Sequence, residues 1–203
     1  GGGRRAGPAV SRSLSRRGYE AVASEVGPTR SQELRDQKIV LALLALHGPG
    51  GEDGAIQGFL ETLGIPYTGS GIQASAIGMH KVTTKTLLAS ACIPVPAGTV
   101  VKRGEKVSSA TLLRAEKLRW PLVVKPASQG STIGVTIVPK PSQWRDALAL
   151  AHRYDTDAMV EAYIPGHEVT VSILGGRNIL PLVLPAVEIV APGGFYDFAA
   201  KYE

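Results

Sequence analysis

The sequence of 203 residues has no long apolar run. The longest run, Ile39 to Leu46, has eight residues, whereas a helix that crosses a bilayer needs roughly 20. We therefore interpret this run as a buried strand and expect no membrane partner. The first residues also lack the charged head, apolar middle and cleavage site of a secretory signal, so we expect a cytoplasmic protein.

Cysteine is almost absent. The one cysteine, Cys92, cannot form an internal disulfide, which suits a reducing compartment. We interpret it as a small core residue rather than a reactive thiol. The histidines at positions 47, 80, 152 and 167 show none of the close spacings of zinc ligands, so they predict no metal site.

Aromatic residues make up only 5% of the sequence, and none lies among the arginines of the first seventeen residues. Those arginines contribute to a net charge of +5, which could suggest nucleic acid. However, Val10 and Leu14 recur among them at helical spacing, which favours a solvated helix face. We therefore expect no nucleic-acid partner.

What the sequence does contain is a loop of glycines and hydroxyls between two apolar runs, LVVKPASQGSTIGVTIV, from Leu122 to Val138. The pattern predicts a strand, a loop and a second strand. Glycine amides can close over an anion and Lys125 adds a positive charge, a combination that suits a nucleotide polyphosphate. From these residues alone, a plain glycine-serine hairpin is an equal alternative. The loop is not a P-loop, because no GxxxxGK[ST] pattern opens a helix here.

In the first half, periodicity predicts alternating helices and strands. A helix that begins near Ala6 ends at Gly18 and leads into a strand. A second helix places Ile56, Phe59, Leu60 and Leu63 on one face and is followed by Gly64. Two prolines, Pro94 and Pro96, then indicate a linker.

In the second half, Trp144, Leu148 and Ala151 predict a helix after Pro141. Strands are expected over residues 158–164 and 168–174. In the apolar run from residue 179 to 190, Pro185 predicts an edge, a bulge or a break. A chain of this length with 44% apolar residues can bury a sizeable core, so we expect a globular α/β protein.

The segment KPASQGSTIGV resembles the phosphate lid of the D-alanine–D-alanine ligases, a family of the ATP-grasp superfamily. Three further segments follow the order of that family: residues 45–71 (ALHGPGGEDGAIQGFLETLGIPYTGSG), residues 79–85 (MHKVTTK), and VEAYIPGHEVTVSIL with PGGFYDFAAKY. The resemblance implies a partial ATP-grasp fold in three domains. They are an N-terminal substrate-binding α/β domain (1–80), a central lid-bearing domain (81–167) and the start of a C-terminal domain (168–203).

The resemblance implies ATP-dependent joining of two D-alanines for peptidoglycan precursors, through an acyl phosphate. Phosphoryl transfer is mostly a matter of positioning and charge neutralisation, so lysines and Mg2+ (or Mn2+) should dominate the site. Two alternatives remain open. The protein could be a related ligase with another second substrate, such as D-lactate, or the chain could be a noncatalytic nucleotide-binding remnant.

The family's nucleotide-binding residues correspond to several positions here. Lys81 and Lys125 match lysines that contact the α- and β-phosphates. The matching adenine hinge is the strand around Glu161, whose carboxylate would accept from the base amino group. The remaining members implied are the backbones of Ala162 and Ile164, the ring of Tyr163, Phe195, and Glu168 on the ribose, for which an ordinary exposed glutamate is the alternative.

The catalytic positions implied are Ser131, Lys201 and Tyr202. Lys201 would reach the transferred phosphoryl group. Ser131 and Tyr202 would hydrogen-bond between the lid and a covering loop, unless they are a solvated hydroxyl and an ordinary surface aromatic. His47 and Glu52 lie in HGPGGEDG, which resembles the loop near the first D-alanine.

Some positions depart from the family pattern. His80 stands where the family usually has aspartate, which leaves any role of that side chain open. The family's first strand and its later magnesium-binding residues have no counterpart, so we expect an internal fragment with open sheet edges. The complete protein is expected to be a homodimer, and the fragment alone to be inactive.

Overall fold

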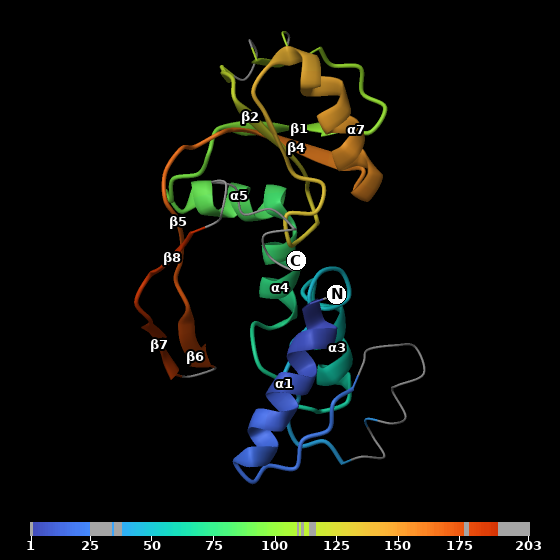
Figure 1. The fold of residues 1–203 in the computed structure, drawn as a ribbon, viewed down its shortest axis with the longest axis vertical. Helices are drawn as coiled ribbons and strands as arrows, with labels where there is room; N and C mark the ends of the chain where they lie inside the picture. Colours follow the sequence, from blue (N-terminus) through green and yellow to red (C-terminus); the bar gives the residue numbers. More distant parts are fainter. Residues whose placement is uncertain are drawn as a thin grey trace.

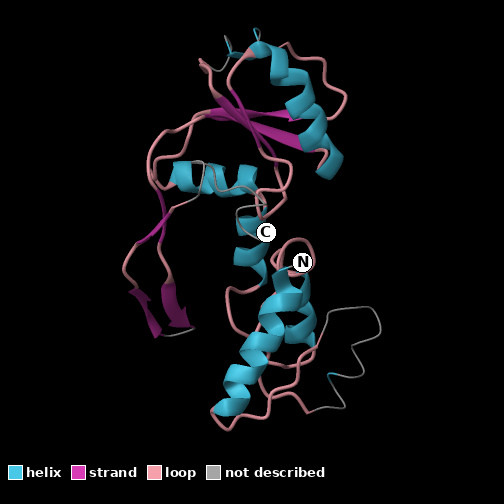
Figure 2. Ribbon diagram, viewed as in Figure 1, coloured by secondary structure: helices cyan, strands magenta, loops and turns pink. Residues whose placement is uncertain are grey.

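The computed structural model describes residues 2–24, 34, 38–108, 110, 112–113, 117–176 and 179–190, with side chains from residue 7 onward. A sheet covered by helix α7 forms one end of the molecule, and helices α1 and α3 lie at the other (Figures 1 and 2). Helices α4 (Ile72–Met79) and α5 (Lys81–Ser90) lie between them (Figure 1). A narrow arm carries the last strands away from the sheet.

The central sheet has four antiparallel strands in the order β1-β4-β2-β3. Their bounds are Gly98–Lys102 for β1, Leu122–Pro126 for β2, Thr136–Val138 for β3 and Asp157–Ala162 for β4. The predicted strand, loop and strand over residues 122–138 are thus confirmed. The predicted helix after Pro141 is also confirmed, as the 3-10 turn η1 (Pro141–Gln143) and α7 (Trp144–Tyr154).

The two faces of this sheet differ in chemistry because successive side chains of a strand point to opposite sides. On one face, Leu122, Val124 and Val160 are completely buried and pack in one cluster with Trp144 and Ala151 of α7. The other face carries the alternate positions. There Lys125 lies opposite Met159, and Val123 lies opposite Glu161. The apolar face fixes the strands, and the second face presents charged groups.

The N-terminal part has a smaller core of Ile56, Leu60 and Ile65. Its helices are α1 (Gly2–Arg16), which the sequence predicted up to Gly18, and α3 (Ala55–Thr62). Gly18 and Gly64 have φ angles of 85° and 69° after these helices, as expected for residues that end a helix in the left-handed region. Both helix ends are therefore confirmed, but residues 19–24 contain no strand, so the strand expected directly after Gly18 was wrong.

The prediction of a buried strand from Ile39 to Leu46 was wrong. Only Ala42 pairs, through a single parallel bridge with Tyr67. Val40 is 85% exposed, and Leu41 and Leu43 are also exposed. A strand needs a neighbour along its edge to satisfy its backbone. Among the described residues, the hydrogen bonds found for the backbone of this run join only Ala42 and Leu44 to residues 66–68. A cavity of about 660 Å³ lies beside the run instead.

The interpretation of Cys92 as a core residue was also wrong. The thiol is exposed in the turn after α5 (Lys81–Ser90), and the residue has a φ of 58°. Residues 93–97 follow without regular structure, which agrees with the linker that Pro94 and Pro96 predicted. The turn places Cys92 outside the helical pattern, so periodicity carried no information about its burial.

The last strands form the arm. The predicted strand from 168 to 174 is divided into β5 (Glu168–Thr170) and β6 (Ile173–Gly176), and β4 ends at Ala162, two residues before its predicted end. A break at Pro185 is confirmed, because β7 (Ile179–Val183) and β8 (Val187–Ile189) lie on either side of it. The two pairs are β5-β8 and β6-β7, both antiparallel.

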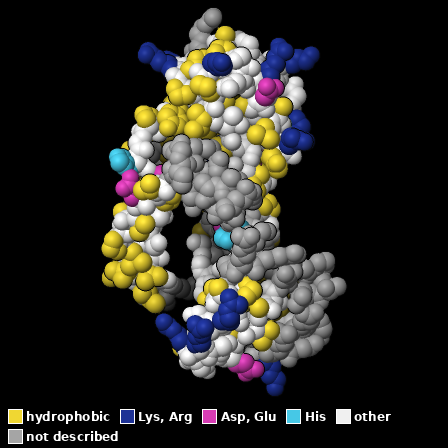
Figure 3. Space-filling model, viewed as in Figure 1, with side chains coloured by type: hydrophobic (Ala, Val, Ile, Leu, Met, Phe, Trp, Pro, Cys, Tyr) yellow, Lys and Arg dark blue, Asp and Glu magenta, His cyan; other side chains and the backbone are white. Residues whose placement is uncertain are grey.

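Apolar side chains cover this arm and face solvent, as the space-filling view shows at the left (Figure 3). Leu180 is 91% exposed, and Ile173 and Val183 are each more than 60% exposed. No helix in the described part of the chain has the length and apolarity needed to cross a bilayer. The arm is therefore an exposed apolar surface made of strands.

Replacing Gly134 by alanine should destabilise the fold. An added Cβ would lie 2.8 Å from Pro126 Cγ and 2.8 Å from Tyr154 Cδ2, and the φ of 71° is unfavourable for alanine. We expect a loss of about 2–4 kcal/mol in the free energy of unfolding, measured with urea. Gly104→Ala is the control, because its φ is 84° with no atom within 4 Å. It should cost about 1 kcal/mol, and equal losses would contradict the packing argument.

Candidate functional site

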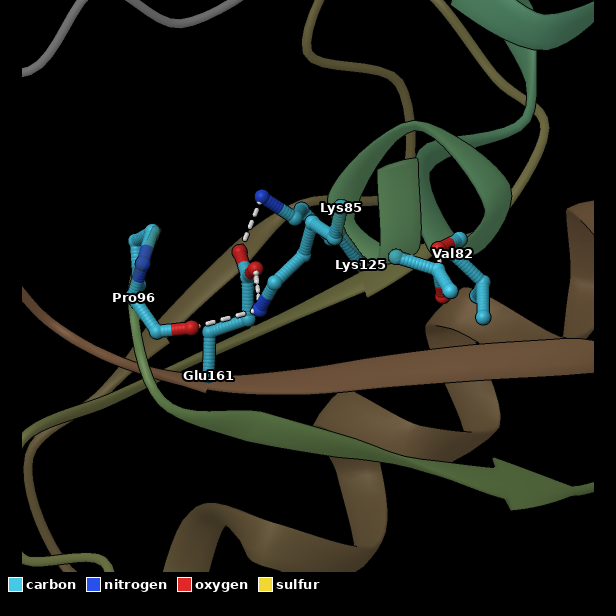
Figure 4. Close-up of polar contacts among 6 residues, drawn as sticks. Val82, Lys85, Pro96, Lys125 and Glu161 are labelled. Carbon is cyan, nitrogen blue, oxygen red and sulfur yellow. Dashed lines mark hydrogen bonds and ion pairs between the residues drawn. The ribbon is translucent and has the colours of Figure 1, made fainter. Parts of the chain in front are cut away.

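Three charged side chains from three elements meet on the face of the central sheet that α7 does not cover, which we call the open face. Glu161 of β4 accepts from Lys85 of α5 at 2.5 Å through Oε1 and from Lys125 of β2 through Oε2. Figure 4 shows both lysine side chains directed at this one carboxylate. Lys85 also donates to the carbonyl oxygen of Pro96 at 2.7 Å. Strand register places Lys125 and Glu161 on the same face, and α5 brings Lys85 to it.

The Glu161 carboxylate is buried, with only 4% of the residue exposed. Burial by itself would raise its pKa, but the hydrogen bonds and positive charges of Lys125 and Lys85 outweigh this effect and hold the pKa below its usual 4.5. Glu161 is therefore ionised near neutral pH. The prediction that it accepts from an adenine amino group stays a prediction, and in this structure both of its oxygens already accept from lysines.

Lys81 is the first residue of α5 and donates to the lid through two groups. Its backbone N–H donates to Ala127 O at 2.9 Å, and its Nζ donates to Gln129 O. Burial, and then the charge of Lys125, lower the pKa of Lys81. Both hydrogen bonds fix Lys81 to the segment that directly follows β2 and its Lys125.

His80 provides the cap of α5. Its Nδ1 accepts from the backbone N–H of Thr83 at 3.2 Å and lies 2.6 Å from Thr83 Oγ1. A cap satisfies one of the free N–H groups of a helix start. The side chain that departs from the family pattern therefore fixes the first turn of the helix, and with it Lys81.

The base of the lid is fixed by Asp155, which follows α7. Its Oδ2 accepts from Ser128 N at 2.7 Å and its Oδ1 accepts from Asp157 N at 3.2 Å. Burial opposes ionisation, but these backbone hydrogen bonds outweigh it and hold the pKa of Asp155 below 3.8. Further along the lid, Ser131 and Thr132 have φ angles of 51° and 61°. Left-handed backbone is uncommon for such residues and is frequent at binding sites.

The lid tip reaches the loop that was expected to bind the first substrate. A Cβ added to Gly130 would lie 3.5 Å from Glu52 Oε2. Glu52 itself accepts from Gly48 N at 2.6 Å, and Asp53 accepts from Gly50 N at 2.7 Å, which is the main reason that the pKa of Asp53 is lowered. Two predicted parts of the site, far apart in the sequence, are therefore brought together. His47 is the first residue of this loop and is exposed.

The predicted adenine hinge lies at the end of β4. Ala162 N donates to Ala97 O at 2.8 Å and Tyr163 N donates to Pro121 O at 3.3 Å. These two N–H groups are therefore used within the protein, and the predicted contacts of the Ala162 and Ile164 backbones with the base stay predictions. Tyr163 and Ile164 are exposed, at 36% and 64%. Glu168 begins β5 and is also exposed, and no described contact joins it to the lysines.

Phe195, Lys201 and Tyr202 lie outside the described residues, so their predicted roles remain predictions. The same holds for the expected hydrogen bond between Ser131 and Tyr202. Among the described residues, no group of three His, Cys, Asp or Glu side chains could hold a metal ion. The Mg2+ expected with ATP therefore has no ligand cluster in that part of the chain.

Three residues of the site were missed by sequence reasoning: Lys85, Asp155 and the capping role of His80. The signal for Lys85 was weak, because a second lysine four residues after Lys81 is typical of a solvated helix face. Asp155 follows a helix and precedes a strand, where aspartate commonly serves a turn. Only the tertiary structure shows that each contacts the lid or the open face.

Comparison with known proteins identifies the family of this chain. The protein-family model for the D-ala D-ala ligase N-terminus matches residues 8–70. The family model for the D-ala D-ala ligase C-terminus matches residues 87–203. A D-alanine--D-alanine ligase of Citrifermentans bemidjiense is 44% identical over 97% of this chain and 60% of its own length. One of Desulforudis audaxviator is 47% identical over 98% of this chain and 64% of its own length.

Two solved structures have a similar fold. The D-alanine-D-alanine ligase from Coxiella burnetii has a TM-score of 0.70 and 30% identity, over 88% of this chain and 53% of that one. The VanG D-Ala:D-Ser ligase from Enterococcus faecalis has a TM-score of 0.70 and 36% identity, over 82% and 48%. The fold is thus that of the ATP-grasp class. The chain belongs to the D-alanine–D-alanine ligase family and spans about 60% of the length of the curated relatives that it matches.

Acid should destabilise the lid base. Because the pKa of Asp155 is below 3.8 in the folded state, the unfolded state binds its proton first as pH falls, and the stabilisation is lost through and below this value. Asp155→Asn should cost about 1–2 kcal/mol at neutral pH, since two backbone N–H groups lose a charged acceptor. It should also make the free energy of unfolding fall less between neutral pH and about pH 3.

Urea unfolding at both pH values measures these effects. The control is Asp146→Asn, which removes an exposed carboxylate from the first turn of α7 and reports the effect of net charge. A decline with pH in Asp155→Asn as steep as that of the unmodified chain would contradict the assignment.

Proposed function

We propose that this chain provides the nucleotide-binding face of an ATP-dependent D-alanine–D-alanine ligase that makes D-alanyl-D-alanine for peptidoglycan precursors. One observation carries the proposal. Lys81 donates to Ala127 O and Gln129 O at the base of a glycine-rich lid, and β2, which leads into this lid, carries Lys125. A Cβ added to Gly130 at the lid tip would lie 3.5 Å from Glu52 in the expected first-substrate loop.

The reaction needs an activated carboxylate. An oxygen of the first D-alanine carboxylate attacks the γ-phosphorus of ATP, and the bond from that phosphorus to the β-phosphate oxygen breaks. ADP is the leaving group, and the D-alanine becomes an acyl phosphate. The amine of the second D-alanine then attacks the acyl carbon, and inorganic phosphate departs with loss of the amine proton. This chain would contribute lysine charges that orient the polyphosphate and offset its negative charge.

The lid would protect the acyl phosphate from water, because hydrolysis would waste the activated intermediate. Its base is pinned by Asp155 and Lys81, so closure would involve the tip around residues 130–134. When bound, Mg2+ would supply further charge at the phosphates. Its ligands would come from outside the described residues, which contain no group of three candidate metal ligands.

Other aspects of the proposal follow from family membership. Several curated relatives that are 42–47% identical to this chain carry the name D-alanine--D-alanine ligase, which favours D-alanine over D-lactate as second substrate. We further propose a cytoplasmic homodimer for the complete protein. Light scattering of the purified protein tests the dimer.

The ligation test uses the full-length protein that includes this chain. With ATP, Mg2+ and D-alanine it should release one ADP for each D-alanyl-D-alanine formed, and D-lactate or D-serine should compete poorly as second substrate. Release of ADP without any dipeptide, or a clear preference for D-lactate or D-serine, would reject the proposed reaction.

Lys125→Met should weaken ATP binding about 10- to 100-fold, because a charge-assisted contact to a phosphate is lost. Equilibrium titration of the chain with ATP measures this effect. The control is Lys140→Met, which removes an equal charge from an exposed residue before η1 and should leave the affinity within about twofold. Equal losses in both variants would show that Lys125 acts only through net charge.

A further inference from the structure

Lys85 ends the MHKVTTK segment, but the family resemblance implies no ligand for it. In the structure its side chain is held by two acceptors. Its Nζ donates to both Glu161 Oε1 and Pro96 O. These two acceptors lie on β4 and on the linker before β1. Two of its three N–H donors are thereby used within the protein. Lys85 is therefore better placed to hold protein groups than to contact a phosphate.

Glu161 links Lys85 to Lys125. The carboxylate is planar and binds one lysine with each oxygen, so fixing Oε1 also fixes the place of Oε2. Lys125 is 23% exposed in its side chain and reaches Oε2 from the neighbouring strand. A free lysine side chain samples many rotamers, and a fixed acceptor restricts them. The position of Lys125 Nζ thus depends on a carboxylate that a second lysine holds.

The charge balance supports this arrangement. Lys85 and Lys125 bring two positive charges to the one carboxylate of Glu161. Without Lys85, the buried Glu161 would lose one of its two partners, and an incompletely paired buried carboxylate is unfavourable. It would then turn toward solvent or water would enter, and Lys125 would follow.

We propose that Lys85 is a positioning residue, which holds Glu161 so that Glu161 in turn holds Lys125 at the nucleotide face. Its effect on ATP rests on the proposed function, but its effect on Lys125 does not. The structure thus assigns a role to the second lysine of the MHKVTTK segment.

The first experiment measures the position of Lys125 without nucleotide. Trace acetylation with acetic anhydride, followed by mass spectrometry of the peptides, gives the rate at Lys125 relative to Lys140. Glu161→Gln should raise this ratio at least about threefold, because the carboxylate that restrains the amine is gone. Lys85→Met should raise the ratio by at least half of the increase seen in Glu161→Gln. Lys85→Arg keeps the charge and the donors, so its ratio should equal that of the unmodified chain.

An unchanged ratio in folded Lys85→Met beside a raised ratio in Glu161→Gln would overturn the proposal. So would an unchanged ratio in Glu161→Gln. Thermal unfolding shows which variants are folded. If Lys85→Met is unfolded, Lys85→Gln keeps a donor for Pro96 O without the charge, and the same comparison decides.

The second experiment is a double-mutant cycle on ATP affinity. Lys85→Met should weaken ATP binding about fivefold in the unmodified chain but less than about twofold when Lys125 is already methionine. Equal losses in both backgrounds would mean that Lys85 acts independently of Lys125, which overturns the proposal. If the unmodified chain does not bind ATP, the proposed function of this face fails for the chain, and the acetylation result alone decides the role of Lys85.

Discussion

The alternation of side chains along β4 is the constraint on which the rest of the structure depends. Ala158 and Val160 point to α7 and complete the core, so Met159 and Glu161 must point to the opposite face. A shift of one residue would place the Glu161 carboxylate in an apolar core and expose the valine. The burial of one face therefore decides where the charges of the other face lie, and the lysines of α5 and β2 follow from that.

Local patterns predicted the elements whose signal is contained in a short segment. The run LVVKP, a glycine loop and a second apolar run were sufficient for β2, the lid and β3, and the spacing of Trp144, Leu148 and Ala151 was sufficient for α7. Prediction failed for residues 39–46 and for Cys92, because burial depends on which partners cover a segment. An apolar run indicates that a segment favours burial, but it does not show which other segments will cover it.

The candidate site shows the same division. The glycine-rich lid and Lys125 could be found from residue types, because phosphate binding needs that chemistry in one segment. Lys85 and Asp155 could not, since each acts through a partner far away in the sequence, at positions 161 and 128 respectively. The strained angles of Ser131 and Thr132 were equally invisible. They reflect the turn that the whole lid must make.

The lid consists of a base and a tip with different mechanical properties. Asp155 and Lys81 tie residues 127–129 to α7, β4 and α5, whereas residues 130–134 fold back through left-handed angles toward Glu52. The base is therefore held by the sheet and by the helices beside it, whereas the tip turns toward the expected substrate loop. If the proposed function holds, substitutions at Gly130 would change the contact with that loop and leave Lys81 and Lys125 in place, so substrate recognition and phosphate binding could change separately in evolution.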